Sequence, residues 1–101
     1  MSNLKSYDQD LIERLRDPEY AAAYLNAVLS DDEEAGVEER FLIALRDVAK
    51  AHGISQISEE SDLNRQNLYK ILSENGNPEL RTLTILLGTI GLRLSVEKKV
   101  S

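Results

Sequence analysis

The stretch SQISEESDLNRQNLYKILSENG, residues 55–76, predicts two short helices separated by three residues. Ser55 is a suitable N-cap for a first helix over 55–61, because serine side chains accept a hydrogen bond from the first helical turn. Asn64 is a suitable N-cap for a second helix from 65 to about 74. The Asn-Gly pair that closes the stretch is typical of a helix end.

The packing between these two helices can also be predicted from the residue spacing. One miniature core is expected from Ile57, Leu63, Leu68 and Ile71. The second helix crosses the first next to the residue after Ile57, and that residue is the small Ser58. The turn needs a residue that tolerates a positive φ, and Asp62 is one of the few non-glycine types that does. The pattern is that of a helix-turn-helix.

The outer face of the second helix carries polar and basic side chains without a carboxylate before Glu74. Arginine pairs with guanine, glutamine or asparagine pairs with adenine, and lysine or serine suits phosphate. The helix N-terminus adds backbone N–H groups that favour an anion. We therefore predict DNA contacts from Asn64, Arg65, Gln66, Asn67, Tyr69, Lys70 and Ser73. The alternatives are an ordinary solvated face and, for Tyr69, partial burial against the turn at Pro78.

Outside this stretch, the pattern of caps, prolines and glycines predicts a mainly α protein. Four further helices are expected: one capped by Asp8, one from Asp17-Pro18 to Leu29, one from Val37 to His52, and one from Asn77-Pro78 to Gly91. The helix that ends at Leu29 is apolar almost all round, which predicts burial on more than one side, in this chain or against a partner. Residues 92–97 alternate apolar and polar side chains, which indicates a short β-strand.

Length and charge indicate one domain with an acidic extension. The chain has 101 residues and a net charge of −6, and its first 36 residues hold three basic and nine acidic side chains. Residues 37–101 hold nine of each, so the whole acidic excess lies in the first third. We predict an acidic N-terminal helical extension over 1–36 and a DNA-binding helix-turn-helix domain with the strand over 37–101.

Composition gives little support for catalysis or for a cofactor. The chain has no cysteine and a single histidine, His52, which is predicted to cap the carbonyls at the end of its helix. No glycine-rich phosphate loop and no metal-ligand spacing is present, so we expect neither an enzyme nor a bound cofactor or metal. Without a membrane-length apolar run, the expected location is the cytoplasm.

Three stretches resemble the addiction-module antidote proteins, which are HigA-like antitoxins with a Cro/cI (lambda repressor)-type helix-turn-helix. They are DPE with AAAYLNA at 17–19 and 21–27, ALRDVA at 44–49, and LYKILSENGNP at 68–78. The resemblance implies a Cro/cI-like domain and a homodimer that represses its own operon at a palindromic operator. It also implies a partner toxin of the RelE/ParE superfamily. Ser58 and Asp62 depart from the alanine and glycine usual in that motif.

Partner or dimer contacts are predicted in two places. They are Tyr20, Tyr24 and Leu25 in the apolar helix, and Leu92, Leu94 and Val96 in the strand. The acidic extension either faces a basic toxin or is only a solubilising surface. The strand has no mate in the chain, so it pairs with its copy or adds to a toxin sheet. Two other functions stay open: a phage-type transcriptional regulator without a toxin, and a protein-interaction module whose helix-turn-helix is purely structural.

Overall fold

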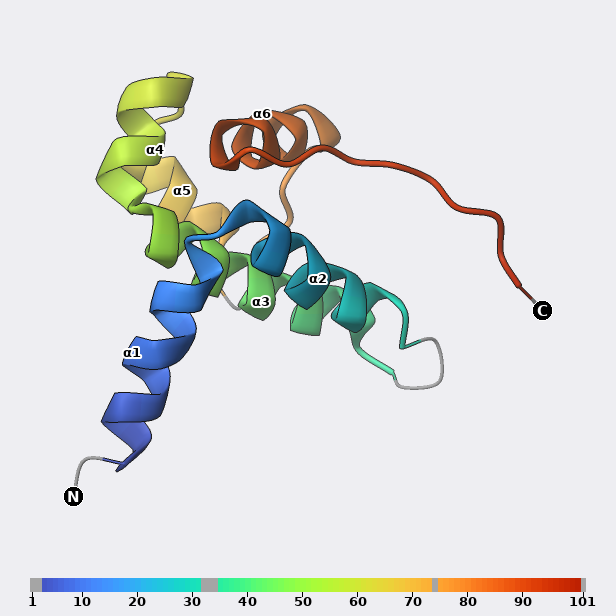
Figure 1. Cartoon of the computed structure of the whole chain (residues 1–101). Coiled ribbons are helices and arrows are strands. Elements are labelled where there is room, and N and C mark those ends of the chain that lie inside the picture. The colour runs from blue at the N-terminus through green and yellow to red at the C-terminus, as the bar shows by residue number, and fades with distance from the viewer. Residues whose placement is uncertain (1–2, 32–34, 74, 101) are drawn as a thin grey trace.

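The computed structural model describes residues 3–31, 35–73 and 75–100, and over these ranges the chain is helical without a strand (Figure 1). The mainly α class is therefore confirmed. The helices are α1 (Asn3–Leu15), α2 (Pro18–Leu29), α3 (Val37–His52), α4 (Ile54–Ser61), α5 (Arg65–Ile71) and α6 (Leu80–Ile90).

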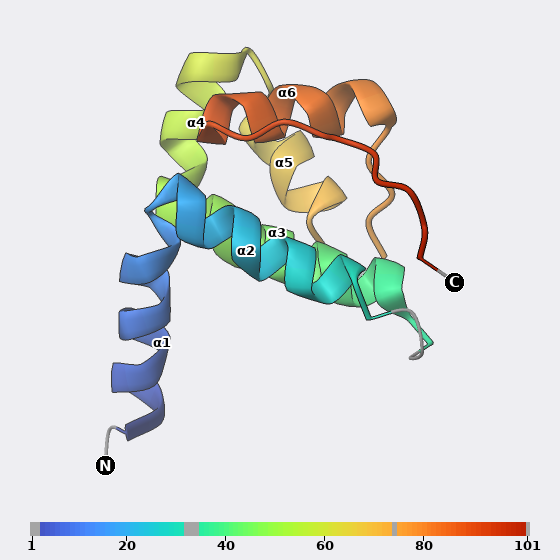
Figure 2. The same ribbon diagram turned by 45° about the vertical axis from the view of Figure 1, so that its right-hand side comes forward.

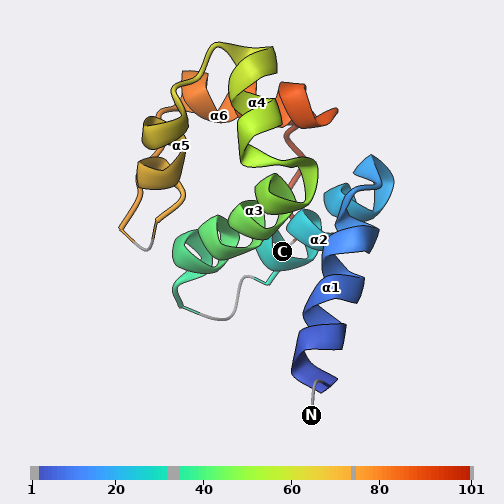
Figure 3. The same ribbon diagram turned by 90° about the vertical axis from the view of Figure 1, so that its left-hand side faces the viewer.

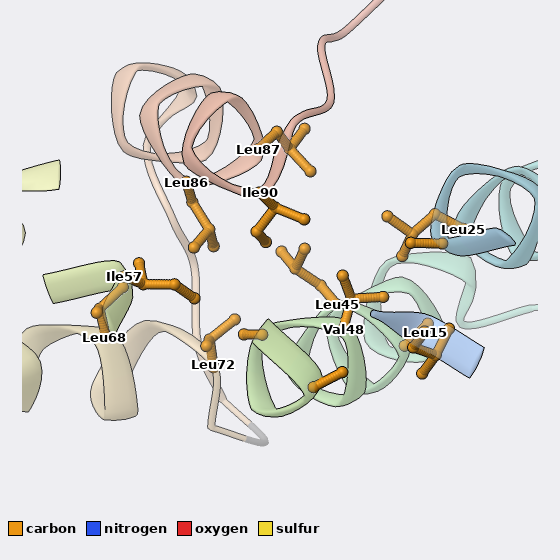
Figure 4. Packing of buried hydrophobic residues seen from close by; sticks show 14 residues of the cluster. Leu15, Leu25, Leu45, Val48, Ile57, Leu68, Leu72, Leu86, Leu87 and Ile90 are labelled. Atoms are coloured by element: carbon orange, nitrogen blue, oxygen red, sulfur yellow. The ribbon is translucent and has the colours of Figure 1, made fainter. Parts of the chain in front are cut away.

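Helix α3 lies in the middle of the molecule and has the bounds predicted for it. Its apolar face repeats every three to four residues, and Leu45 and Val48 on that face are fully buried. Figure 4 shows these two side chains between Leu25 of α2 and the side chains of α4, α5 and α6. Complete burial of a leucine or valine side chain stabilises a fold by about 1.5–3 kcal/mol. Helix α3 therefore connects α1 and α2 on one side with α4, α5 and α6 on the other (Figure 2).

A single hydrophobic cluster runs through the chain. It includes residues from the acidic first third as well as from the remainder, so the inner side of α1 and α2 belongs to the common core. Its buried members are Leu15, Ala21, Leu25, Ala44, Leu45, Val48, Ala49, Ala51, Ile57, Leu68, Leu72, Leu86, Leu87 and Ile90.

The start of α2 is confirmed as predicted. An Asp17 side-chain oxygen accepts a hydrogen bond from the amide of Glu19 at 3.2 Å, and Pro18 is the first helical residue. Proline suits this position because its missing N–H would have no partner in the first turn. The expected burial on more than one side does not occur within the chain, since Tyr20 is 37% and Leu29 47% exposed.

The predicted starts of α1 and α6 are wrong. Helix α1 begins at Asn3, so Asp8 lies inside the helix and does not cap it. No glycine or proline interrupts the residues before Asp8, so nothing stops the helix from extending to them. Helix α6 begins at Leu80 rather than at Pro78, and Glu79 is its N-cap. Pro78 instead lines an apolar groove of about 220 Å³ with Phe41 and Leu83.

The predicted C-terminal strand is absent. After α6 ends at the left-handed Gly91, the Leu92 amide donates to the Leu87 carbonyl at 2.7 Å, and residues 92–100 continue without regular structure. Figure 1 shows this segment running beside α6 and then away from the helices. A strand needs a second strand to satisfy its backbone groups, and the described part of the chain provides none.

Candidate nucleic-acid interface

The connection between α4 and α5 is a tight turn held by its own side chains. Asp62 has φ 64°, in the left-handed region, as the sequence predicts. The Ser58 hydroxyl donates to the Leu63 carbonyl at 2.7 Å. The Ser61 hydroxyl donates to the Ile57 carbonyl at 2.5 Å and accepts from the Leu63 amide at 3.2 Å. The bonds to the Leu63 amide and carbonyl satisfy two backbone groups that lie between the helices, outside the hydrogen-bond pattern of either helix.

The predicted miniature core is present beneath this turn. Ile57 and Leu68 are fully buried, while Leu63 and Ile71 are half-buried and pack against the cluster. Leu72 is buried as well, so α5 is anchored along its inner side. The prediction for Ser55 is wrong, because α4 begins at Ile54 and no side chain caps it.

Asn64 is the N-cap of α5, as predicted. Its side-chain oxygen accepts from the amides of Gln66 at 2.8 Å and Asn67 at 3.2 Å. An asparagine N-cap stabilises a helix by about 1 kcal/mol relative to alanine. Helix α5 ends at Ile71, earlier than predicted, and Glu74 lies outside the described residues.

The outer side of α5 faces solvent. Figure 3 shows the helix at the edge of the molecule, on the opposite side from α1. Tyr69 is 59% exposed, and it lines a groove with Arg46 and Lys50 that does not include Pro78. All seven residues predicted to contact DNA are exposed: Asn64, Arg65, Gln66, Asn67, Tyr69, Lys70 and Ser73.

Hydrogen bonds order two of these exposed side chains. Nη2 of Arg65 donates to the Ser55 hydroxyl at 2.9 Å, which links α5 to the first turn of α4. The Ser73 hydroxyl donates to the Lys70 carbonyl at 2.7 Å and so satisfies one of the last carbonyls of α5. Arg65 is thus held at the N-terminal end of the surface, next to the Asn64 cap.

Sequence reasoning missed Arg46 of α3. Its Nε donates to the Leu72 carbonyl at 2.6 Å, a charge-assisted bond that fixes the C-terminal end of α5 against α3. Arg46 and Lys50 line a shallow groove of about 120 Å³ with Tyr69 and Ser73. In the sequence, the only sign of this role is that Arg46 directly follows the buried Leu45 and so lies next to the apolar stripe of its helix.

A hydrogen-bonded network of three side chains links α3 and α4. Oε2 of Glu60 accepts from Nε2 of Gln56 at 3.1 Å, and its Oε1 lies 3.4 Å from Nε2 of His52. The hydrogen bond from Gln56 and then that from His52 lower the pKa of Glu60, since both favour the ionised carboxylate. His52 therefore contacts α4 through its side chain, and the end of α3 is formed by Gly53.

The residues predicted for partner contact have three different environments. Leu25 lies in the core, 5% exposed, and Tyr24 donates its hydroxyl proton to Asp47 at 3.0 Å. Leu92 packs against the core. Tyr20, Leu94 and Val96 are exposed, at 37%, 42% and 99%.

The described residues contain no group of three or more histidine, aspartate or glutamate side chains that could hold a metal ion. A search of the same residues finds no helix with the length and apolar character needed to cross a membrane.

Comparison with known proteins places nearly the whole chain in one family. Residues 4–98 match a family model described as "Probable addiction module antidote protein". A protein of Haemophilus influenzae, described as uncharacterized, is 35% identical over 91 residues, which are 90% of each chain. No solved structure matches the chain.

Proposed function

The chain belongs to the family of probable addiction module antidote proteins, and from this membership we propose that it is the antitoxin of a toxin–antitoxin pair. In this proposal the chain binds and neutralises a toxin of the RelE/ParE type and also represses its own operon. It acts by binding alone and catalyses no reaction. The proposed site of action is the cytoplasm.

DNA binding is proposed through α4 and α5 as a helix-turn-helix of the Cro/cI type, with α5 in the major groove. The observation that carries this proposal is the outer face of α5, on which Arg65, Gln66, Tyr69 and Lys70 are exposed without a carboxylate among them. The buried Leu68 and Leu72 and the Asn64 cap hold that face rigid from the inside. A helix anchored from the inside, with polar and basic side chains on its outer face, suits a phosphate backbone and base edges.

The repressor is proposed to act as a homodimer on a palindromic operator. Each copy inserts one α5, and the two half-sites then lie about one helical turn, or a multiple of it, apart. The net charge of −6 opposes nonspecific binding, because DNA repels a negatively charged protein. Specific contacts from α5 therefore have to supply most of the operator affinity.

Gel shifts on the DNA upstream of this gene test the proposal. Arg65→Ala and Gln66→Ala are each expected to cost about 1–3 kcal/mol on the operator and to relax base preference at one position. Lys70→Ala is expected to weaken binding to all sequences and to reduce the salt slope by about one, as for the loss of a phosphate contact.

Arg14→Ala is the matched control for these variants. Arg14 is an exposed arginine on α1, on the far side of the molecule from α5, where it pairs with Asp10 at 3.2 Å. The Arg14→Ala substitution removes one positive charge and leaves the proposed DNA-binding surface unchanged, so operator binding should not change. Wild-type affinity and salt slope in all three α5 variants would contradict DNA binding through this helix.

The toxin partner is tested by co-expression with the product of the neighbouring reading frame. We expect co-purification, and we expect the antitoxin to relieve growth arrest by that product. Asp8→Asn, Glu13→Gln and Glu19→Gln together should weaken the complex if the exposed acidic side chains of α1 and α2 face a basic toxin.

The control for this triple variant neutralises Glu38, Glu59 and Glu79, which are exposed outside the extension. It changes the net charge by the same amount, so equal weakening by both triple variants would argue against a specific acidic contact. A protein that binds its operator but has no toxic neighbour would instead be a phage-type regulator.

A further inference from the structure

The backbone of residues 93–100, which follow α6, is unpaired within the described part of the chain. From Arg93 to Val100, no amide or carbonyl group hydrogen-bonds to the backbone of another described residue. The segment is exposed, and its side chains alternate, with Leu92, Leu94 and Val96 at even positions and Arg93, Ser95 and Glu97 at odd positions. An open backbone of this kind is a template for pairing with another chain.

We propose that residues 93–97 of two copies pair with each other as an antiparallel ribbon centred on Ser95. This ribbon is the contact of the homodimer proposed above, and the inference rests on that dimer. In an antiparallel pair the numbers of opposing residues have a constant sum. Centring on Ser95 places Arg93 opposite Glu97 of the other copy, and Leu94 opposite Val96, each pair occurring twice by symmetry.

Charge complementarity selects this register from its neighbours. A ribbon centred on Leu94 sets Arg93 opposite Ser95 and makes no ion pair. One centred on Val96 sets Arg93 opposite Lys99, two like charges, which is unfavourable across strands. Sliding one strand by one residue relative to the other, which centres the ribbon between two residues, would bring apolar side chains opposite polar ones. The reason is that successive side chains of a strand point to opposite faces.

In the register centred on Ser95, the exposed apolar side chains of the segment are covered by those of the other copy. Leu92 packs against the core, but Leu94 is 42% and Val96 99% exposed in the single chain. A groove of about 300 Å³ lies between the segment and helices α2, α3 and α6, and it is lined by Arg93, Ser95 and Glu97 as well as by the apolar Leu87, Leu92 and Leu94. Pairing places Leu94 of one copy against Val96 of the other. Because a two-stranded ribbon is only marginally stable alone, the dimer should dissociate on dilution.

Charge reversal tests the register directly. Arg93→Glu and Glu97→Arg, each alone, put two pairs of like charges into one dimer and should raise its Kd roughly tenfold. The double variant restores opposite charges in the reverse sense, so its Kd should return to within about twofold of wild type. Sedimentation equilibrium at several protein concentrations measures all four proteins. The two residues are exposed and lie outside the helices, and circular dichroism verifies that each variant is folded.

Cross-linking tests the centre of the ribbon. The chain has no cysteine, so Ser95→Cys introduces a single thiol that lies opposite its own copy in the proposed register. Mild oxidation should link most of the protein into dimers. Val100→Cys is the control, because the same residue of two antiparallel strands lies far apart at this position, and it should stay largely uncross-linked.

The inference is overturned if the protein is monomeric at all concentrations, if the double charge reversal does not restore the dimer affinity lost in the single variants, or if Val100→Cys cross-links as well as Ser95→Cys.

The operator experiment separates the failure of the ribbon from the failure of the proposed DNA-binding function. Operator binding that depends on Arg65 but not on Arg93 or Glu97 would leave the DNA-binding function standing and remove the ribbon. If the double charge reversal restores the dimer but Arg65→Ala binds the operator as wild type does, the ribbon stands and the proposed DNA-binding surface is removed.

Discussion

Asp62 adopts a left-handed backbone conformation, with φ 64°, between α4 and α5. A residue with a Cβ atom pays roughly 1–2 kcal/mol for this conformation, and aspartate reduces the cost by local hydrogen bonding. Asp62→Gly is therefore expected to be neutral or slightly stabilising, whereas Asp62→Ala should lower the free energy of unfolding by about 1 kcal/mol. Urea denaturation of both variants measures the difference. Equal stability of the glycine and alanine variants would show that the turn relaxes.

Gly76 is required for a different reason, which is close approach of two backbone segments. A Cβ atom at this position would overlap the carbonyl oxygen of Ile71, at the end of α5. Gly76→Ala should therefore shift the loop or the helix end and destabilise the fold by about 1–3 kcal/mol.

Gly88 is the matched control for this substitution. It lies inside α6, and apart from its chain neighbours and the adjacent backbone of the helix, no described atom is within 4 Å of the place where its Cβ would be. Gly88→Ala should stabilise the protein by about 0.5–1 kcal/mol, because alanine favours the helix. Thermal melts of the two glycine variants should thus move in opposite directions, and a shift of both to lower temperature would contradict the open environment of Gly88.

At the scale of elements, α3 and α4 are linked by the carboxylate of Glu60. Hydrogen bonds from Gln56 and His52 lower the pKa of this group, so the folded protein binds fewer protons than the unfolded chain in mild acid. The resulting stability is present above the ordinary glutamate pKa and is lost as the pH falls through the lowered pKa of the folded state.

Glu60→Gln removes this contribution. The free energy of unfolding should therefore decline less steeply in the variant than in wild type as the pH is lowered through this window. Gln56→Ala removes the stronger donor and should give an intermediate slope. Urea titrations at a series of acidic pH values measure the three slopes, and identical slopes would mean that the network does not persist in solution.

At the scale of the whole molecule, the acidic first third shares its core with the proposed DNA-binding helices. Leu15 of α1 is 2% exposed within the same cluster as Leu68 of α5. Leu15→Ala should lower the free energy of unfolding by about 2–5 kcal/mol, with a single transition for the whole chain. Hydrogen exchange of α5 amides should accelerate along with that of α1.

Leu80→Ala is the matched control, since Leu80 at the start of α6 is 70% exposed. The same chemical change at this position should alter stability by no more than about 0.5 kcal/mol. If Leu15→Ala instead loosens α1 and leaves the exchange of α5 amides unchanged, the first third unfolds independently of the rest.

Local chemistry made much of this fold predictable. The cap at Asp17 with Pro18, the bounds of α3, the Asp62 turn and the Asn64 cap follow from neighbouring residues, and each appears in the structure as expected. The outer face of α5 was predictable for the same reason, because helical geometry determines which side chains point away from a buried leucine. Its role in DNA binding stays a proposal.

The sequence alone determined the helices whose ends are formed by local caps and glycines, together with the side chains that α5 exposes. Only the tertiary structure decided that Arg46 fixes the end of α5, that His52 meets Glu60, that Pro78 turns into a groove before α6, and that residues 92–97 form no strand in the single chain. The physical reason is distance along the chain. Caps act within a turn of helix, whereas these four features depend on partners that are brought together, or left absent, by the packing of separate elements.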